Sequence, residues 1–392
     1  MGTILLVALL QMAQITLNPA IDTIVEVFSP HSLADVQKAL ALISIVSMLS
    51  GVVSAPLISR GVFSKRAAML AGLTLLGVTG ICSLLLHTEF WHLQMLSVMV
   101  GAAMGLFIVN TASVFFDNFT DEERQPIAGY QTSCINAGGI FWNLAGGILC
   151  TLVWYGGYLM LMLALPVTVL AWFTVPKTEK VKKREKTDAP PEKMKPMIFY
   201  YCAILGIFMA IYNVVGANIA THLRQAGVEN PAALAGFASA AQMAGGVVCG
   251  LFFGKLSAKL GDLLLACACL ALVVGFALLG LFPNSIVITF IAMFVAGMSL
   301  SFTAPRVMFA VSALANLDTS AIASALANSI APSLGAFVSP YIFTEITLKL
   351  FGEATGSRYL FTAGVAAVFG AVIVAATLRR RKSGYTDMGE KI

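Results

Sequence analysis

The chain has 392 residues, of which 58% are hydrophobic and only 11% are charged, and its formal net charge is +5. Its mean hydropathy of +0.88 excludes an ordinary soluble domain, whose surface must be far more polar. The alternation of apolar and polar residues that marks the strands of a membrane β-barrel is absent. We therefore predict an all-α polytopic membrane protein.

Hydropathy divides the chain into about twelve apolar segments of roughly 20–28 residues, each long enough to cross the hydrocarbon core of a bilayer as a helix. They lie near residues 3–27, 36–59, 67–88, 91–117, 126–150, 153–175, 197–222, 231–256, 262–282, 285–313, 320–347 and 357–379. A charged, proline-containing segment separates the first six from the last six. We expect an N-terminal six-helix half (1–176), a cytoplasmic basic linker (177–196), a C-terminal six-helix half (197–380) and a cytoplasmic tail (381–392).

The distribution of basic residues predicts the orientation of these segments. With the N-terminus inside, 19 of the 24 lysines and arginines fall in cytoplasmic segments and four fall in outer ones, which leaves Arg306 within a span. This bias follows the positive-inside rule. We therefore expect a multi-pass protein of the inner or plasma membrane with both termini in the cytoplasm, in contact with membrane lipids and without a nucleic-acid partner.

The seven cysteines and four histidines show no spacing typical of metal ligands. We expect free thiols that pack as small apolar side chains, and neither a metal nor another cofactor. The chain also has no nucleotide-binding loop and no nucleophile–base pair, which argues against an ATP-driven pump and against an enzyme.

Polar residues on the first span follow helical steps. Gln11, Gln14, Asn18, Asp22 and Glu26 fall within an arc of about 120° if the segment is a regular helix. They could be hydrogen-bond partners between helices in a dry bundle, but two acids exceed what such contacts need. We therefore predict that this face lines a cavity, with Gln14 and Asn18 as substrate contacts and Asp22 as the proton-coupling carboxylate.

The two halves match each other at an offset of 196 residues. This offset aligns Gly101 with Gly297 and Asn110 with Arg306. It also aligns Thr132, Asn136, Gly139 and Asn143 of the fifth span with Asn328, Pro332, Gly335 and Ser339 of the eleventh. The glycines could serve close helix packing alone. We expect Asn110, Asn136, Asn143 and Asn328 to line the substrate path.

Arg306 lies within an apolar span, where a charge costs roughly 3 kcal/mol on the mildest insertion scale. The same helical face carries Ser299, Phe302, Thr303 and Phe309, a setting that suits an organic anion with an apolar body. The alternative is a structural ion pair, with Asp22 or Asp117, or a bond to carbonyls freed by Pro305. Further candidates for lining the substrate path are Phe302, Thr303, Tyr212, Asn213 and Gln242.

The layout of two six-span halves resembles the major facilitator superfamily, and so do the loops after the second and eighth spans. That family carries Gly-x-x-x-Asp-Arg-x-Gly-Arg-Arg there. The second copy here keeps Gly254, Lys259 and Gly261, and the first has Arg60, Lys65 and Arg66. The family's aspartate, which makes charge contacts between helices, is replaced by Ser59 and Ala258, and Ser97 stands near the place of its fourth-span arginine.

The resemblance implies two pseudo-symmetric six-helix halves that rock around a central site. We expect a monomeric secondary active transporter that moves a small organic solute by alternating access and is coupled to protons or another ion. An organic anion is the favoured substrate. The alternatives are an amphiphile, lipid or multidrug efflux carrier, and a transporter-like sensor that binds but does not carry.

Overall fold

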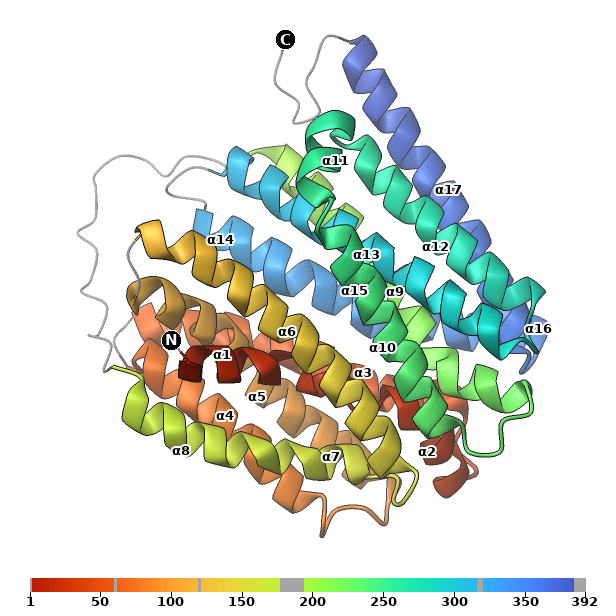
Figure 1. Ribbon diagram of the computed structural model, residues 1–392, viewed down its shortest axis with the longest axis horizontal. Coiled ribbons are helices and arrows are strands. Elements are labelled where there is room, and N and C mark those ends of the chain that lie inside the picture. The colour runs from red at the N-terminus through yellow and green to blue at the C-terminus, as the bar shows by residue number, and fades with distance from the viewer. Residues whose placement is uncertain (1, 60–61, 119–120, 177–193, 316–319, 384–392) are drawn as a thin grey trace. The chain divides into compact units, whose positions relative to one another are not determined.

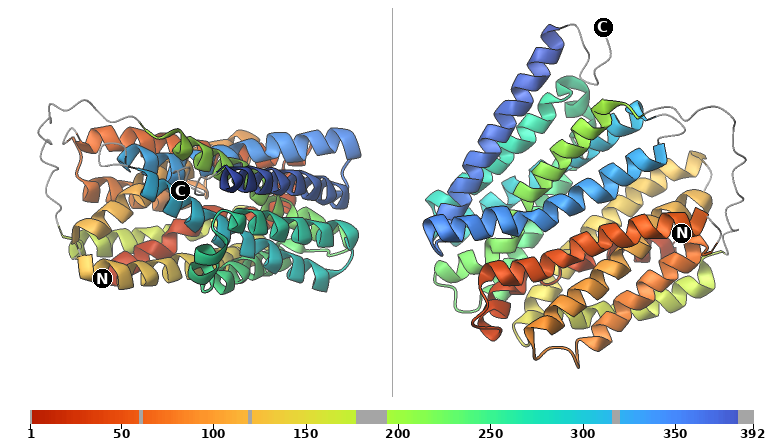
Figure 2. Two further views of the ribbon diagram at one scale, coloured as in Figure 1. Left: turned by 90° about the horizontal axis from the view of Figure 1, so that it is seen from above. Right: turned by 180° about the vertical axis from the view of Figure 1, so that it is seen from behind.

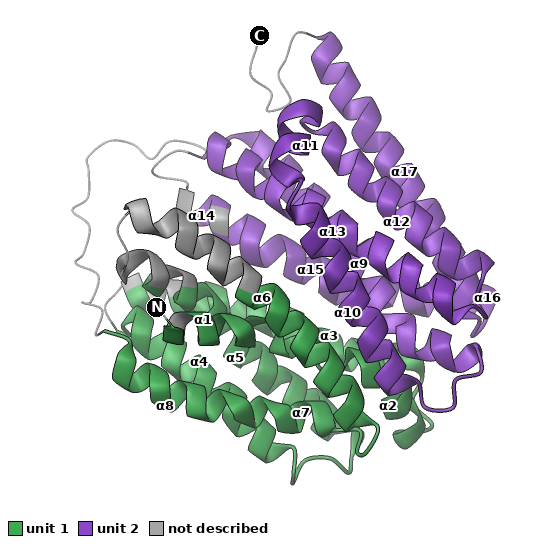
Figure 3. Cartoon of the chain, in the orientation of Figure 1, with its two compact units in different colours: residues 1–188 green, residues 189–392 purple. Residues whose placement is uncertain are grey.

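A computed structural model describes residues 2–59, 62–118, 121–176, 194–315 and 320–383, and every described element is helical. The predicted all-α class is thus confirmed. The chain forms two compact units, unit 1 (residues 1–188) and unit 2 (residues 189–392), which Figure 3 colours separately. We describe each unit by itself.

Eleven stretches among the described residues are long and apolar enough to span a membrane. They are Leu5–Val27, Leu33–Ser54, Lys65–Cys82, Phe90–Thr111, Gly156–Thr174, Pro196–Gln225, Pro231–Gly250, Leu263–Leu281, Ile286–Leu314, Leu326–Phe351 and Thr355–Lys382. The predicted span at 126–150 falls in helix α6, of which Cys134–Cys150 is a shorter apolar stretch. Helices suit a bilayer because they satisfy every backbone hydrogen bond within one segment.

In unit 1, α5 lies against α3 and α4, while α6 lies against the first span (Figure 1). The elements after the first span are α3 (Leu33–Ser59), α4 (Lys65–Cys82), α5 (Phe90–Asn118), α6 (Asp121–Cys150), α7 (Gly156–Met160), η3 (Leu161–Leu163) and α8 (Ala164–Thr174). Glycine permits the close crossing of α5 and α3, since a Cβ on Gly101 would lie 2.6 Å from the carbonyl oxygen of Ile43.

The first span is not the regular helix that the sequence predicted. It consists of α1 (Gly2–Leu9), the 3₁₀ segments η1 (Leu10–Ile15) and η2 (Asn18–Ala20), and α2 (Ile21–Val27). Pro19 lacks a backbone N–H and restricts the residue before it, which explains the interruption. The expected arc of polar residues, which assumed regular helical steps, is therefore wrong in detail. Interrupted helices of this kind form binding sites in several transporter folds.

Unit 2 places α12 between α13 and α17, as Figure 1 and the right-hand view of Figure 2 show. Its main helices are α9 (Pro196–Gln225), α10 (Pro231–Gly250), α11 (Phe253–Leu260), α12 (Leu263–Leu281), α13 (Ile286–Leu314) and α17 (Thr355–Lys382). The eleventh span is divided into α14 (Ser320–Ala325), the π-helical η4 (Leu326–Ile330), α15 (Ala331–Ser339), the π-helical η5 (Pro340–Glu345) and α16 (Ile346–Phe351).

The packing of the glycines repeats between the units. Gly297 brings α13 against the backbone of Gln242 on α10, as Gly101 brings α5 against α3. Gly335 likewise meets the backbone of Gly206 on α9, and Gly138 meets that of Leu9 in the first span. In each unit, the fourth span thus crosses the second, and the fifth crosses the first, at a residue without a side chain. Gly101 and Gly297 are separated by the offset of 196 residues, and Gly138 and Gly335 by 197.

Candidate functional site

Asp262 is the centre of a buried charge cluster in unit 2. Its Oδ1 accepts hydrogen bonds from Nε and Nη2 of Arg306, at 3.1 and 2.9 Å. Its Oδ2 accepts one from the Tyr201 hydroxyl at 2.7 Å and lies 3.6 Å from Nη1 of Arg380. Asp262 is 1% exposed and Arg306 is 5% exposed. We call these four residues the Asp262 cluster.

The local fold explains how four helices reach one carboxylate. Helix α11 ends at Leu260, and Gly261 then adopts a positive φ of 59°, a conformation that glycine takes at little cost. The turn places Asp262 directly before α12, beside α13, which carries Arg306, and α17, which carries Arg380. Tyr201 comes from the second turn of α9. The cluster thus ties four spans together at one end of the unit.

The identity of the acid is a finding that the sequence comparison missed. The family's motif predicts an aspartate at the position of Ala258, and the contact between helices is instead made by Asp262, four residues later. Arg306 thus forms an ion pair with Asp262, a carboxylate that the sequence analysis did not name among its partners. Arg306 keeps its predicted aromatic neighbour, since its guanidinium carbon lies 5.7 Å from the centre of the Phe309 ring.

The other predicted residues of unit 2 occupy different surroundings. Tyr212 on α9 and Gln242 on α10 are both buried, and these two helices pack against each other. Phe302 and Thr303 are buried on α13, where Thr303 donates to the Ser299 carbonyl. The remaining residues vary in exposure: Asn213 is half-buried, Asn328 is exposed in η4, and Gly254 and Lys259 lie in α11.

In unit 1, Asp22 is 6% exposed at the start of α2, directly after the interrupted part of the first span. Gln14 and Asn18 are half-buried in the 3₁₀ segments, whereas Glu26 is exposed. Gln11 is buried beside them. The carboxylate that was predicted to carry a proton is thus shielded from bulk water and lies beside irregular backbone.

The predicted asparagines of unit 1 are largely shielded. Asn110 and Asn143 are buried, and each donates to a carbonyl one turn earlier in its own helix, those of Leu106 and Gly139. Oδ1 of Asn143 is buried without a hydrogen bond, and Asn136 on the same helix is half-buried. The buried Oδ1 leaves an acceptor that a ligand or water can satisfy.

The loop after the second span, in unit 1, makes different contacts from the loop after the eighth span, in unit 2. Arg60 lies outside the described residues, and Lys65 opens α4. Arg66 places its guanidinium over the Trp172 ring at 5.7 Å and donates to the Trp172 carbonyl.

No group of three or more metal-binding side chains gathers in the described part of either unit.

Arg358 is a buried charge that counting basic residues had assigned to an outer segment. It is 1% exposed, and donates from Nε to Oγ1 of Thr347 at 3.1 Å and from Nη1 to Oδ1 of Asn218 at 2.6 Å. No carboxylate among the described residues forms an ion pair with it, and Nη2 has no hydrogen bond. One turn along α9 from Asn218, the fully buried His222 contacts Thr355 at 3.0 Å. The spacing of Asn218 and His222 within an apolar span was the available signal.

Comparison with known proteins identifies the fold and the family. Residues 3–340 match the model of the Major Facilitator Superfamily. No curated protein sequence matches the chain. Among solved structures, an auto-inhibited POT family peptide transporter has a TM-score of 0.76 at 11% identity, covering 97% of each chain. The nucleoside transporter NupG has a TM-score of 0.73 at 13% identity, covering 95% of this chain and 98% of its own. A bacterial homologue of the lysosomal transporter Spinster has a TM-score of 0.67 at 16% identity, covering 95% of each chain. The chain therefore belongs to the Major Facilitator Superfamily and is a membrane transporter, not an enzyme.

Proposed function

We propose that this transporter moves a small organic anion with an apolar body by alternating access, and that Arg306 exchanges between Asp262 and the acidic group of the substrate. The observation that carries the proposal is the buried contact between Arg306 and Asp262, with nitrogen–oxygen distances of 2.9 and 3.1 Å. The names of similar structures, which include peptide and nucleoside transporters, support an organic solute as the class.

Arg306 has the chemistry that such an exchange needs. Its guanidinium is planar, always charged and suited to a carboxylate, sulfate or phosphate. A substrate anion that replaces the Asp262 carboxylate would keep the buried guanidinium paired, so the exchange avoids the cost of an isolated buried charge. Phe309, which is 52% exposed, offers an apolar surface next to the guanidinium for the body of the substrate.

The position of the pair also suits a contact that changes during transport. Arg306 lies eight residues before the end of α13, which corresponds to roughly 12 Å along the helix axis. Buried ion pairs add little net stability, and their best-attested use is to select one arrangement over another. We propose that the Asp262 cluster holds unit 2 in one conformation and that substrate binding at Arg306 releases Asp262. In the same proposal, Asp22 of unit 1 couples the cycle to protons.

The proposal is tested by measuring binding of a panel of organic anions and cations to purified wild type and to Arg306→Ala, Arg306→Lys and Asp262→Asn. Arg306→Ala should weaken anion binding by about 10- to 150-fold, the equivalent of about 1.5–3 kcal/mol. Arg306→Lys should also be impaired, because a point charge does not reproduce the planar fork. Asp262→Asn should bind anions at least as tightly as wild type, since the competing carboxylate is gone.

The anion affinities of the Arg306 and Asp262 variants together distinguish the proposed exchange from an ion pair that is purely structural. If the well-folded Arg306→Ala protein binds anions normally, or if Asp262→Asn weakens binding as much as Arg306→Ala does, the exchange is refuted. Flux into proteoliposomes then tests transport itself, because a sensor would bind an anion without carrying it.

A further inference from the structure

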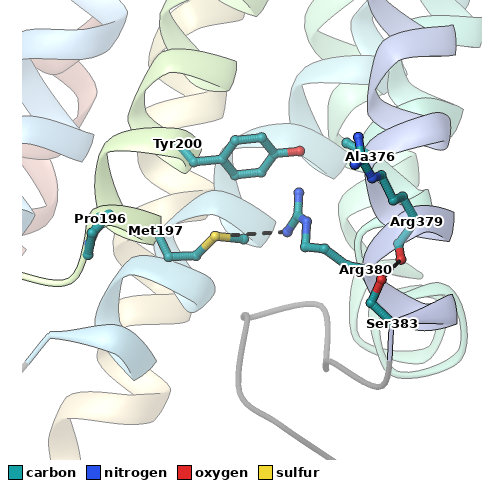
Figure 4. Close-up of a pocket in the computed structure, with 7 residues that line it drawn as sticks. All are labelled: Pro196, Met197, Tyr200, Ala376, Arg379, Arg380 and Ser383. Carbon is teal, nitrogen blue, oxygen red and sulfur yellow. Dashed lines mark hydrogen bonds between the residues drawn. The ribbon is translucent and has the colours of Figure 1, made fainter.

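A cavity of about 610 Å³ lies at the end of unit 2 where α9 begins and α17 ends. Figure 4 shows its lining, which consists of Pro196, Met197 and Tyr200 from α9 and Ala376, Arg379, Arg380 and Ser383 from α17 and its C-terminal cap. None of these residues is a proposed substrate or proton site, so the cavity needs an explanation of its own.

The cavity is positively charged. Arg380 points toward α9, with its guanidinium carbon 4.3 Å from the centre of the Tyr200 ring and Nη1 4.0 Å from Sδ of Met197 (Figure 4). Arg379 is exposed, and its side chain makes no hydrogen bond or ion pair within the described part of the chain. No acidic residue is among those that line the cavity. Two guanidinium groups at one opening suit a phosphodiester, which accepts hydrogen bonds from each in a fork geometry.

The cavity also has apolar lining, and exposed apolar residues neighbour that lining in the sequence. Pro196, Met197 and Ala376 supply apolar lining. Next to the lining residues in sequence, Phe199 is 53% exposed and Leu378 is 45% exposed. A ligand with both a phosphate and hydrocarbon chains can occupy the charged opening and this apolar surface together, whereas free phosphate would use only the first.

The depth of the cavity agrees with such a ligand. It lies at the ends of two membrane-spanning helices, which is the level of lipid headgroups. Arg379–Lys382 belong to the basic last turn of α17, on the side that the positive-inside rule assigns to the cytoplasm. Anionic lipids of that leaflet are attracted to basic residues beside a span.

We infer that this cavity binds the headgroup of an anionic phospholipid, with the phosphate on Arg379 and Arg380 and the acyl chains along the apolar outer surface of α9 and α17. The site is connected to the Asp262 cluster, because Nη1 of Arg380 lies 3.6 Å from Oδ2 of Asp262. A bound phosphate therefore competes with Asp262 for Arg380.

The site is tested with the full-length protein in nanodiscs of phosphatidylcholine into which phosphatidylglycerol is titrated, with bound lipid counted by native mass spectrometry. Arg379→Gln should weaken phosphatidylglycerol binding by about tenfold or more, because it removes charge-assisted hydrogen bonds to the phosphate. Lys382→Gln is the matched control, since it removes the same charge from the same helical turn but does not line the cavity. It should weaken binding by no more than about fivefold, the effect of one basic residue near a membrane surface.

Three results would overturn the inference. Equal losses in Arg379→Gln and Lys382→Gln would show diffuse attraction to the basic turn, and no loss in Arg379→Gln would exclude the site. Displacement of the lipid by millimolar inorganic phosphate would show an anion site without lipid selectivity.

A further variant tests whether Arg380 takes part in binding the phosphate. Asp262→Asn removes the competing carboxylate and should strengthen lipid binding, and unchanged affinity in the folded variant would contradict that part.

Discussion

Removing the carboxylate of Asp262 should destabilise unit 2 far more than removing an exposed charge. Asp262→Asn leaves Arg306, which is 5% exposed, without its paired carboxylate, and takes the same carboxylate from Arg380. Breaking a buried pair on one side costs about 3–5 kcal/mol. Arg306→Met should cost less, because Asp262 keeps its hydrogen bond from Tyr201 and its contact with Arg380. The double variant Asp262→Asn/Arg306→Met should recover most of the loss, since the buried guanidinium of Arg306 is gone and only Arg380, whose side chain is 19% exposed, has lost its contact with the carboxylate.

The assay must report on unit 2, and the chain offers a way to do this. All four tryptophans lie in residues 1–188, whereas Cys202, Cys249 and Cys269 are buried in unit 2. Thermal exposure of these thiols to a fluorogenic maleimide reports on unit 2, once the cysteines of unit 1 are replaced by alanine. A loss of 3–5 kcal/mol should lower the midpoint by roughly 6–20 °C, on the scaling for about 200 residues.

The matched control is Lys349→Gln, which breaks a pair with Glu345 at 3.0 Å in which the lysine side chain is 73% exposed. An exposed pair one helical turn apart contributes only about 0.3–0.5 kcal/mol, so the midpoint should hardly move. If Asp262→Asn shifts the midpoint no more than Lys349→Gln does, the Asp262 cluster does not hold the four helices together and the reasoning from burial is refuted.

Three further outcomes are expected. Asp22→Asn should abolish proton-driven accumulation in proteoliposomes but preserve counterflow exchange, and unchanged accumulation at every pH would remove Asp22 from the coupling. Arg358→Met should keep the thermal midpoint near that of wild type, because the loss of two hydrogen bonds is offset by the removal of a buried charge. The same variant should reduce transport. A fall of more than about 3 kcal/mol in the free energy of unfolding would show that Arg358 is structural instead. In a cysteine-free background, an impermeant thiol reagent added outside should label Glu353→Cys and not Lys382→Cys, and the opposite pattern would reverse the predicted topology.

The all-helical class and most spans could be predicted because a bilayer imposes a length and a composition on every crossing segment. Hydropathy does not report backbone geometry, however. The first span has the composition of a helix from Leu5 to Val27, yet it contains two 3₁₀ segments around Pro19. The eleventh span similarly contains π-helical segments, one of which begins at Pro340. Both irregularities depend on how proline is accommodated by neighbouring helices, which one sequence does not specify.

The burial of Arg358 could not be predicted from position alone. It lies in the first turn of α17, where an arginine would ordinarily reach water or headgroups. It is buried because Asn218, 140 residues earlier, and Thr347 supply its hydrogen-bond acceptors. Charge counting treats every basic residue near a span end alike, and only the tertiary contacts distinguish a solvated arginine from an enclosed one.

The two loops that resemble each other in sequence use different chemistry, and this difference bears on mechanism. In unit 1 the described arginine of the loop, Arg66, meets the ring and carbonyl of Trp172, contacts that involve no carboxylate. In unit 2 the motif has Ala258 at the position of the family's aspartate, and Asp262, which follows the turn at Gly261, supplies the carboxylate that meets the arginine of α13. An anionic substrate or a phosphate can compete with Asp262 for the guanidinium groups of Arg306 and Arg380. The described contacts of Arg66 include no carboxylate with which such an anion would compete. We therefore expect ligand charge to act on unit 2 through the Asp262 cluster, while unit 1 responds to protons through Asp22.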